Sequence, residues 1–205
     1  AVRRGAVNVL AHAENTAKFG VPVVVAVNRF ATDTDAEVAE LIAACEAAGV
    51  PAVVADPWGG GGEGCLDLAD AVWAALEGGE ADFRPLYPDD VGLVEKVETV
   101  AREIYGADGV DFDAAALKSI DRLEAMGMRE MPVCITKTQY SFSDDPSLLG
   151  RASGFRLSVR DAVPSAGAGF SVVLTGNVMT MPGLGAVPAA TKMGVDADGR
   201  AVGLF

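Results

Sequence analysis

Residues 21–30 read VPVVVAVNRF, and this stretch decides the fold. Its first seven residues are dominated by valine, a pattern typical of a strand that is covered on both faces of a parallel sheet. A second apolar run, at residues 50–55, predicts another strand. Helical spacing of apolar residues predicts helices over 7–19, 34–48 and 66–76. This β-α-β-α alternation predicts an α/β fold with a parallel βαβ sheet layer and a right-handed crossover.

The pattern changes near residues 82–88, where Pro85 and Pro88 follow the pair Gly78-Gly79. We therefore expect an α/β segment at 1–82 and a C-terminal α+β domain at 83–205. In the second part, the sequence predicts helices over 91–105 and 114–126, joined by a turn at 106–109. The predicted strands are 131–136, 155–159, 170–174 and 178–181, followed by a turn at Asp198-Gly199.

Composition excludes several classes of partner and site. The chain has 205 residues, a formal net charge of -13 and a sequence pI near 4.4, so it should repel nucleic acid and anionic membranes. Its apolar runs are too short to cross a bilayer. Three scattered cysteines and one histidine predict no zinc site or other protein-held metal. Free cysteines favour a reduced, cytoplasmic location.

Two loops that leave predicted parallel strands each carry one aromatic ring, Phe30 or Trp58. In open α/β sheets, ligands bind just outside the carboxyl ends of the strands. A planar ligand held between two rings needs about 7 Å, from two contacts of roughly 3.5 Å each. Glycines 59–62 and 64 follow Trp58, and their lack of Cβ atoms lets the backbone approach a flat ligand. The sequence thus predicts a slot between the two rings.

A structural explanation of the same residues stays open. Phe30 can cap the sheet core, Trp58 can fasten its loop to a helix, and the glycines can form a plain surface turn. A phosphate cradle is disfavoured, because no Gly-Lys-Ser or Gly-Lys-Thr occurs in the chain. We expect Trp73, on the helix that follows, to lie in the core.

Other polar residues are weaker candidates, and none is assigned a catalytic role. Asp33 and Asp35 could bind a cation, but aspartates at a helix start more often interact with its dipole. Glu63 could act as a general base only if it points inward. The remaining candidates, each with a simple structural explanation, are His12, Lys137, Thr138, Gln139, Arg156 and Arg160.

The string KFGVPVVVAVNRFATDTDAE at 18–37 resembles formate–tetrahydrofolate ligases. Further matching segments are WGGGGEG at 58–64, IYGAD at 104–108, PVC at 132–134, KTQYS at 137–141, VRD at 159–161, MTMPGL at 179–184 and GLF at 203–205. The resemblance covers nearly the whole chain and favours the slot over its structural alternative.

The resemblance implies ATP-dependent formylation of tetrahydrofolate. Formate attacks the γ-phosphate to give formyl phosphate, and N10 of tetrahydrofolate then takes the formyl group. It implies that Phe30 and Trp58 hold the pterin, with Gly61 and Gly62 beside it. It implies further that Asn28, Thr180 and Pro182 contact the nucleotide. The implied small molecules are formate, ATP with Mg²⁺, tetrahydrofolate and a monovalent cation, and the implied assembly is a cytoplasmic homotetramer.

The chain also departs from the family pattern. Ala31 and Gly185 stand where the family often has proline. The family's phosphate-binding loop is missing, so the chain resembles a C-terminal portion and is expected to be inactive by itself. Two alternatives stay open: a non-catalytic remnant that binds folate or a nucleotide, and an unrelated α/β module in which Asn28 meets a purine edge.

Overall fold

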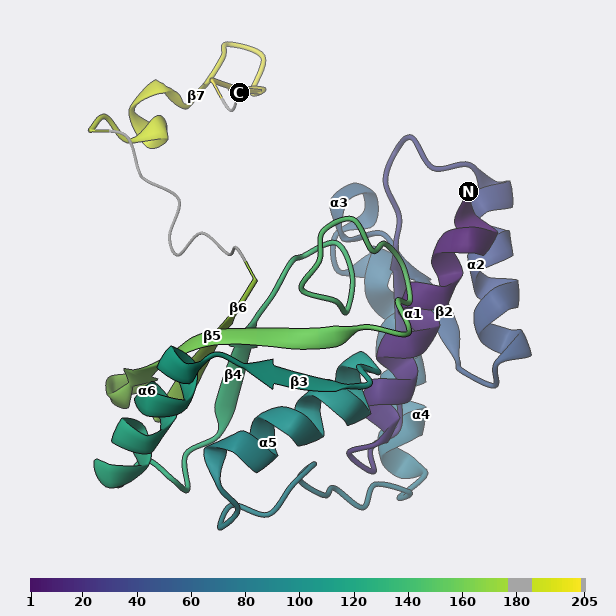
Figure 1. The fold of residues 1–205 in the computed structure, drawn as a ribbon. Coiled ribbons are helices and arrows are strands. Elements are labelled where there is room, and N and C mark those ends of the chain that lie inside the picture. Colours follow the sequence, from purple (N-terminus) through teal and green to yellow (C-terminus); the bar gives the residue numbers. More distant parts are fainter. Residues whose placement is uncertain (177–185, 204–205) are drawn as a thin grey trace.

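The computed structural model describes residues 1–176 and 186–203 (Figure 1). The first part of the chain forms helices and two strands in alternation. Their bounds are α1 Val2–Ala17, β1 Val25–Asn28, α2 Asp35–Ala47, β2 Ala52–Ala55, α3 Pro57–Gly60, the 3-10 helix η1 Glu63–Cys65, and α4 Leu66–Glu77. Strands β1 and β2 pair in parallel, with Val25 opposite Ala52 and Asn28 opposite Ala55. The predicted α/β class and its parallel sheet layer are confirmed.

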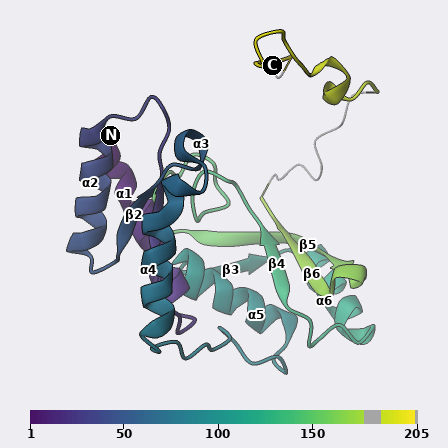
Figure 2. The same ribbon diagram turned by 180° about the vertical axis from the view of Figure 1, so that it is seen from behind.

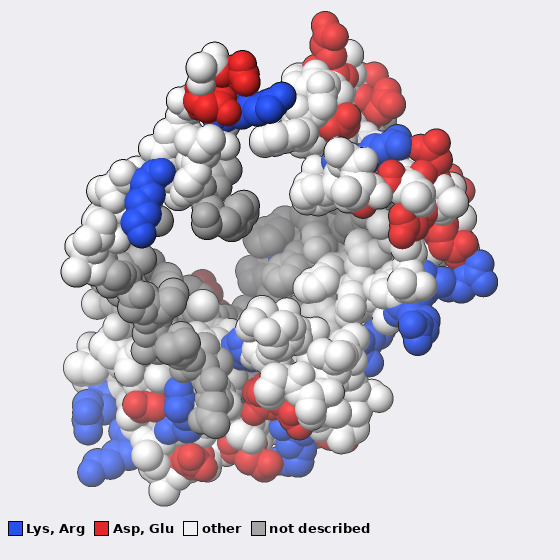
Figure 3. Space-filling model, turned by 90° about the horizontal axis from the view of Figure 1, so that it is seen from above, with Lys and Arg blue, Asp and Glu red and all other residues white. Residues whose placement is uncertain are grey.

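Charged side chains on the surface are mixed in sign. On the face in Figure 3, basic side chains lie in small groups among acidic and uncharged ones. Among the described residues, no helix is both long and apolar enough to cross a membrane.

Helix α2 begins at a reciprocal cap formed by Thr34 and Glu37. The Thr34 hydroxyl accepts from the backbone N–H of Glu37, and the Glu37 carboxylate accepts from the backbone N–H of Thr34. This reciprocal pair satisfies two N–H groups that a helix start otherwise leaves free. Val38 and Cys45 then pack with Val25 and Val27 in a core beneath the sheet.

Strand β1 differs from the prediction in two ways. It starts at Val25 rather than Val21, because the first ladder hydrogen bond runs from the Val25 N–H to the Pro51 carbonyl. Its two faces also differ: Val25 and Val27 are buried, whereas Ala26 and Asn28 are exposed. Helix α4 packs against β2 (Figure 2). The expectation of a strand covered on both faces is therefore wrong for the described chain.

The second part of the chain forms a four-stranded mixed sheet in the order β3-β5-β6-β4. Strands β3 and β5 are parallel, β5 and β6 antiparallel, and β4 and β6 parallel. The bounds are α5 Leu93–Val100, the π-helix η2 Ala101–Tyr105, β3 Gly109–Phe112, α6 Ala114–Ala125, β4 Val133–Thr136, β5 Arg156–Ser165, the 3-10 helix η3 Ala166–Ala168 and β6 Phe170–Thr175. After residue 185 come the 3-10 helix η4 Ala189–Lys192 and a hairpin of β7 Gly194–Val195 and β8 Ala201–Val202.

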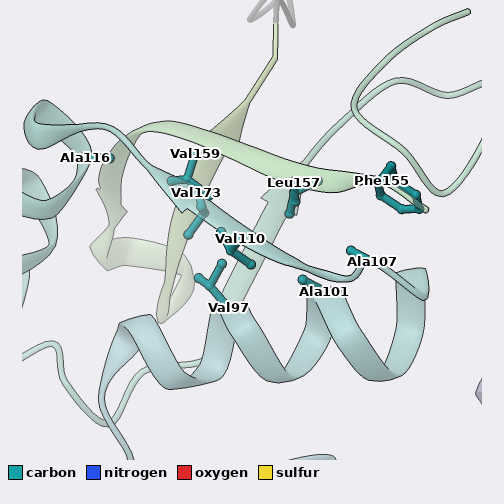
Figure 4. Close-up of a cluster of buried hydrophobic side chains, with 9 residues drawn as sticks. All are labelled: Val97, Ala101, Ala107, Val110, Ala116, Phe155, Leu157, Val159 and Val173. Carbon is teal, nitrogen blue, oxygen red and sulfur yellow. The ribbon is translucent and has the colours of Figure 1, made fainter. Parts of the chain in front are cut away.

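The core of this sheet lies between its strands and the α5–η2 helix (Figure 4). Val97 and Ala101 project from the helix toward Val110, Leu157 and Val173 on the strands, and all five are buried. The small Ala101 lets the helix lie close to the sheet. Helix α5 runs without a break into the π-helix η2, which ends at Gly106, whose left-handed φ of 70° suits glycine.

Two strands of this sheet were incompletely predicted. Strand β3 was not predicted: Gly109 ends the predicted turn, and no element was predicted for residues 110–112, which carry too little alternation to stand out. Strand β5 continues six residues beyond its predicted end at Val159, because residues up to Ser165 pair with β6. Pairing with another strand, which the pattern of a single strand does not encode, sets both outcomes. The predicted strand 178–181 lies outside the described residues.

Along the sequence, the β1-β2 sheet comes before residue 82 and the four-stranded sheet comes after it. The division into domains at 82/83 stays a prediction. Several contacts join the two parts. The Arg151 guanidinium forms a paired ion bridge with Glu14, and the Asn15 amide donates to the Ile104 carbonyl at 2.7 Å. The rings of Phe19 and Phe83 stack with their centroids 6.4 Å apart.

Lys96 is fully buried, a feature that the sequence does not reveal. Its ammonium donates to three backbone carbonyls, those of Asp89 and Arg129 at 2.8 Å and that of Met131 at 3.1 Å. Burial lowers the pKa of this amine. The three acceptors come from segments before and after helices α5 and α6, so Lys96 ties these segments together.

Candidate functional site

A cavity of about 670 Å³ opens at the carboxyl ends of β1 and β2. Its walls come from the loops that follow these two strands, as the parallel topology predicts. The lining residues are Asn28, Arg29, Phe30, Ala31, Thr32, Asp56, Pro57, Trp58 and Gly59. We call this cavity the stacking slot, because Phe30 and Trp58 both line it. The expectation that the two rings share one edge of the sheet is confirmed.

The loop carrying Phe30 is held by its own backbone and by Asp33. The Arg29 N–H donates to the Ala55 carbonyl at 2.9 Å, which continues the sheet ladder by one residue. The Phe30 N–H donates to the Asp33 carboxylate at 2.8 Å, and the Asp33 N–H donates back to the Phe30 carbonyl at 3.0 Å. With the backbone fixed in this way, the Phe30 ring is left 64% exposed.

The loop carrying Trp58 is built around Asp56. Pro57 is the first residue of the short helix α3, where its fixed φ suits a helix start. The Asp56 carboxylate accepts from the Gly59 N–H at 2.7 Å, and the Asp56 N–H donates to the Gly64 carbonyl at 2.9 Å. Trp58 is 92% exposed, so the ring packs on almost nothing in this chain. That exposure argues against the alternative in which Trp58 fastens its loop to a helix.

The glycines of this loop differ in their roles. A Cβ on Gly59 would lie 2.5 Å from the Asp56 carboxylate, and one on Gly64 would overlap the Asp56 carbonyl. Gly61 has φ 55° and ψ -137°, a conformation open essentially to glycine alone. No atom stands near a Cβ built on Gly62. Gly61 and Gly62 are not among the residues that line the stacking slot, and their contact with substrate stays a prediction.

The chemistry of the slot favours a flat, largely apolar ligand with a few polar edges. Two exposed rings supply faces for stacking, and the polar groups at its rim are those of Asn28, Arg29, Thr32 and Asp56. The one arginine is already paired, since its guanidinium lies 2.6 Å from the Asp35 carboxylate. No lysine lines the cavity. The arrangement therefore suits a heterocycle and offers little to hold a polyphosphate.

The other predicted site residues have separate outcomes. Asn28 lines the stacking slot, whereas Thr180 and Pro182 lie outside the described residues. Glu63 is exposed on η1 and is not part of the cavity lining. Asp35 pairs with Arg29, and Asp33 holds the Phe30 backbone, so both have partners within the chain. Within the described ranges, no three His, Cys, Asp or Glu side chains gather as metal ligands would.

Lys137, a candidate for meeting an anion, binds its own loop instead. Its ammonium donates to the carbonyls of Thr138 and Ser141 and lies over the rings of Tyr105 and Phe142. Burial lowers the pKa of this amine. The ring of His12 contacts that of Phe142 in a tilted arrangement, with centroids 4.8 Å apart, which fits the expected structural role.

Arg156 is also engaged within the fold. Its guanidinium forms a forked pair with the Asp111 carboxylate of the neighbouring strand, at 2.7 to 3.0 Å, and holds the pKa of that carboxyl below its usual value. Arg160 is exposed on β5, and Gln139 borders the cavity beside His12.

The expectation that Trp73 lies in the core is wrong. Trp73 is 64% exposed on α4, and Leu66 and Leu76 of the same helix are exposed as well. The residues of α4 are apolar at helical spacing, which predicts one buried face. In this chain α4 contacts β2 and η1, and that contact buries none of its side chains fully.

Tyr105 offers a spectroscopic test of the packing beside Lys137. Burial, with a smaller contribution from Cys134, raises the pKa of its phenol from 10 to about 12. We expect one of the three tyrosines to ionise late in an alkaline titration followed at 295 nm, and Tyr105→Phe to remove that step. Between pH 10 and 12 the unfolded chain releases a proton that the folded chain keeps. This group therefore stabilises the fold fully below pH 10, and its contribution is lost as the pH rises to 12. A late step that survives Tyr105→Phe would contradict this assignment.

Comparison with known proteins connects the chain with one protein family. The family model described as formate–tetrahydrofolate ligase matches residues 1–205. The chain is 52% identical to the formate–tetrahydrofolate ligase of Paenarthrobacter aurescens (strain TC1) and 52% identical to that of Maricaulis maris (strain MCS10). Each alignment covers 100% of this chain and 37% of the relative, so the chain spans little more than a third of their length. A family model that matches every residue shows that the chain belongs to the formate–tetrahydrofolate ligase family.

Proposed function

We propose that this chain provides the folate-binding part of an enzyme that joins formate to tetrahydrofolate at the expense of ATP. The stacking slot is the observation that carries the proposal. It places two exposed rings, Phe30 and Trp58, at one edge of a parallel sheet, in a chain of the formate–tetrahydrofolate ligase family. A pterin is a flat heterocycle, and a slot with two aromatic walls suits its shape.

In the proposed reaction, a formate oxygen attacks the γ-phosphorus of ATP, ADP leaves, and formyl phosphate forms. N10 of tetrahydrofolate then attacks the formyl carbon, phosphate leaves, and 10-formyltetrahydrofolate results after loss of a proton from N10. The slot's part is to hold the folate so that N10 meets the formyl carbon. Stacking contributes roughly 0.5 to 1.5 kcal/mol per aromatic pair beyond burial, enough to orient the ligand but far less than the whole catalytic effect.

The nucleotide side of the reaction is a further part of the proposal. Asn28 borders the slot, and we assign it with Thr180 and Pro182 to nucleotide contacts. ATP would enter with Mg²⁺, and a monovalent cation is a further candidate. The phosphate-binding loop must come from residues outside these 205, because no Gly-Lys-Ser or Gly-Lys-Thr occurs among them.

The remaining proposals concern the setting of the enzyme. We propose a homotetramer whose partners are small molecules rather than nucleic acid, and the chain's net charge of -13 supports the second point. We place it in the cytoplasm. All three cysteines lie in the described residues and are free, which fits a reducing compartment.

Replacing the exposed ring of Trp58 tests the proposal directly. We expect Trp58→Ala to weaken tetrahydrofolate binding by about 1 to 2 kcal/mol, or roughly five- to thirtyfold, through lost stacking and lost apolar burial. Trp58→Phe should keep much of the affinity because a ring remains. The measurement is calorimetric titration of the 205-residue chain with tetrahydrofolate, alongside its melting temperature.

Trp73→Ala is the matched control, since Trp73 is the only other tryptophan, is also exposed, and is not part of the cavity lining. It should leave the dissociation constant unchanged. Because Trp58 is 92% exposed, Trp58→Ala should leave the melting temperature nearly unchanged as well. Equal affinity in the wild-type chain and in a folded Trp58→Ala variant would refute the stacking role.

A further inference from the structure

Each ring of the stacking slot sits on a turn that an aspartate holds through the backbone. Asp33 accepts from the N–H of Phe30 itself, at 2.8 Å. Asp56 accepts from the N–H of Gly59, one residue past Trp58, at 2.7 Å. In both cases the aspartate lies within three residues of the ring, so its carboxylate fixes a short segment of chain rather than a distant one.

Asp56 does more than cap one turn. Its N–H donates to Gly64 and its carbonyl accepts from Gly60, so three of its polar groups bond within the loop 56–64. Gly59 and Gly64 pack against it so closely that neither position has room for a Cβ. The loop is therefore closed on Asp56, and Trp58 projects from the closed part with 92% of its surface exposed.

Both rings are largely exposed, so the direction of each ring depends mainly on the turn that carries it. A ring that moves freely before binding loses that freedom when the ligand arrives, and the lost freedom weakens binding. A turn that already points the ring into the slot reduces this loss. The hydrogen bonds that Asp33 and Asp56 accept fix the backbone of both turns in this way.

We propose that Asp33 and Asp56 are positioning residues, which set the Phe30 and Trp58 turns so that the two rings face a flat ligand before it binds. The proposal rests on the function proposed above, and it assigns affinity to two carboxylates that act through the rings. Neither is assigned a contact with the reacting atoms.

A double-mutant cycle tests this proposal for Asp56. In the 205-residue chain, Asp56→Ala should weaken tetrahydrofolate binding roughly three- to tenfold, because the Trp58 turn is no longer fixed. In a Trp58→Ala background the same change should alter the dissociation constant by less than about twofold, since the ring through which it acts is gone. Asp56→Asn should retain most of the affinity, because its amide oxygen still accepts from Gly59. The corresponding cycle pairs Asp33→Ala with Phe30→Ala.

Asp70→Ala is the matched control, because Asp70 is an exposed aspartate on α4 that loses the same charge. It should not change the affinity. A second readout is kinetic, in a chimera in which this chain replaces the matching part of the Maricaulis maris relative. There Asp56→Ala should raise KM for tetrahydrofolate and leave KM for ATP and formate unchanged.

The outcomes separate the positioning role from the proposed function. An Asp56→Ala effect that persists in full without Trp58 would show direct ligand contact and overturn positioning. If an aspartate-to-alanine variant has a lower melting temperature but the folded chain keeps its affinity, that aspartate is a structural cap and not a positioning residue. The proposed function itself is refuted if Trp58→Ala has no effect on affinity. It is also refuted if neither the unsubstituted 205-residue chain nor the unsubstituted chimera binds tetrahydrofolate.

Discussion

Replacing Lys96 by methionine is expected to lower the free energy of unfolding by about 3 to 5 kcal/mol, because three backbone carbonyls lose the donor that the fully buried ammonium supplies. Methionine nearly matches the volume of the lysine stem, so the effect reports the ammonium and not a cavity. The carbonyls of Asp89, Arg129 and Met131 would each lose the bond that satisfies them. Urea denaturation of the 205-residue chain measures the difference.

Lys118→Met is the matched control for this substitution. Lys118 is exposed on α6, so the same chemical change should alter the free energy of unfolding by less than about 0.5 kcal/mol. A cost below about 1 kcal/mol for Lys96→Met would mean that water satisfies the three carbonyls. Lys96 would then not be what ties the segments around α5 and α6 together.

The second large effect concerns turnover. The purified 205-residue chain, supplied with ATP, Mg²⁺, formate and tetrahydrofolate, is expected to form no 10-formyltetrahydrofolate above the uncatalysed background. The chain has no Gly-Lys-Ser or Gly-Lys-Thr, and the stacking slot has no lysine in its lining to hold a transferring phosphate. Phosphoryl transfer depends on such positioning and charge stabilisation, so its loss should be close to complete.

The chimera with the Maricaulis maris relative serves as the positive control for turnover. It supplies the part of the relative's sequence that this chain does not match, and it should form product. Measurable ATP-, formate- and folate-dependent synthesis by the 205-residue chain would contradict the prediction. Folate binding without turnover by the same chain would agree both with the proposed role and with the missing phosphate-binding loop.

Local sequence was sufficient where short-range physics sets the structure. The start of helix α2 and the Asp198-Gly199 turn each depend on neighbours within a few residues. The parallel pairing of β1 with β2 also followed, because a helix between two strands leaves few other connections. That topology then placed Phe30 and Trp58 at one edge of the sheet.

Features that depend on distant residues were missed or misjudged. Strand β3 exists because it pairs with β5, whose residues lie 47 positions further along the chain, and the extension of β5 exists because it pairs with β6 across a hairpin, over 5 to 13 residues. Lys96 looks like any helix-surface lysine until its three carbonyl partners, 7 to 35 residues away, surround it. Trp73 looked like a core residue because helical spacing shows that a face is apolar and does not show what covers it.

The sequence by itself therefore determined the fold class, the family and the two rings of the stacking slot, since these follow from periodicity, chain order and motif. Only the tertiary structure decided how the rings are held and where buried charge is satisfied. Asp33 was expected to serve a helix start and instead holds Phe30, and Asp56, which no sequence pattern singled out, closes the loop that carries Trp58. The physical reason is that a hydrogen bond depends on the positions of two groups in space, and sequence fixes those positions only after the whole chain has packed.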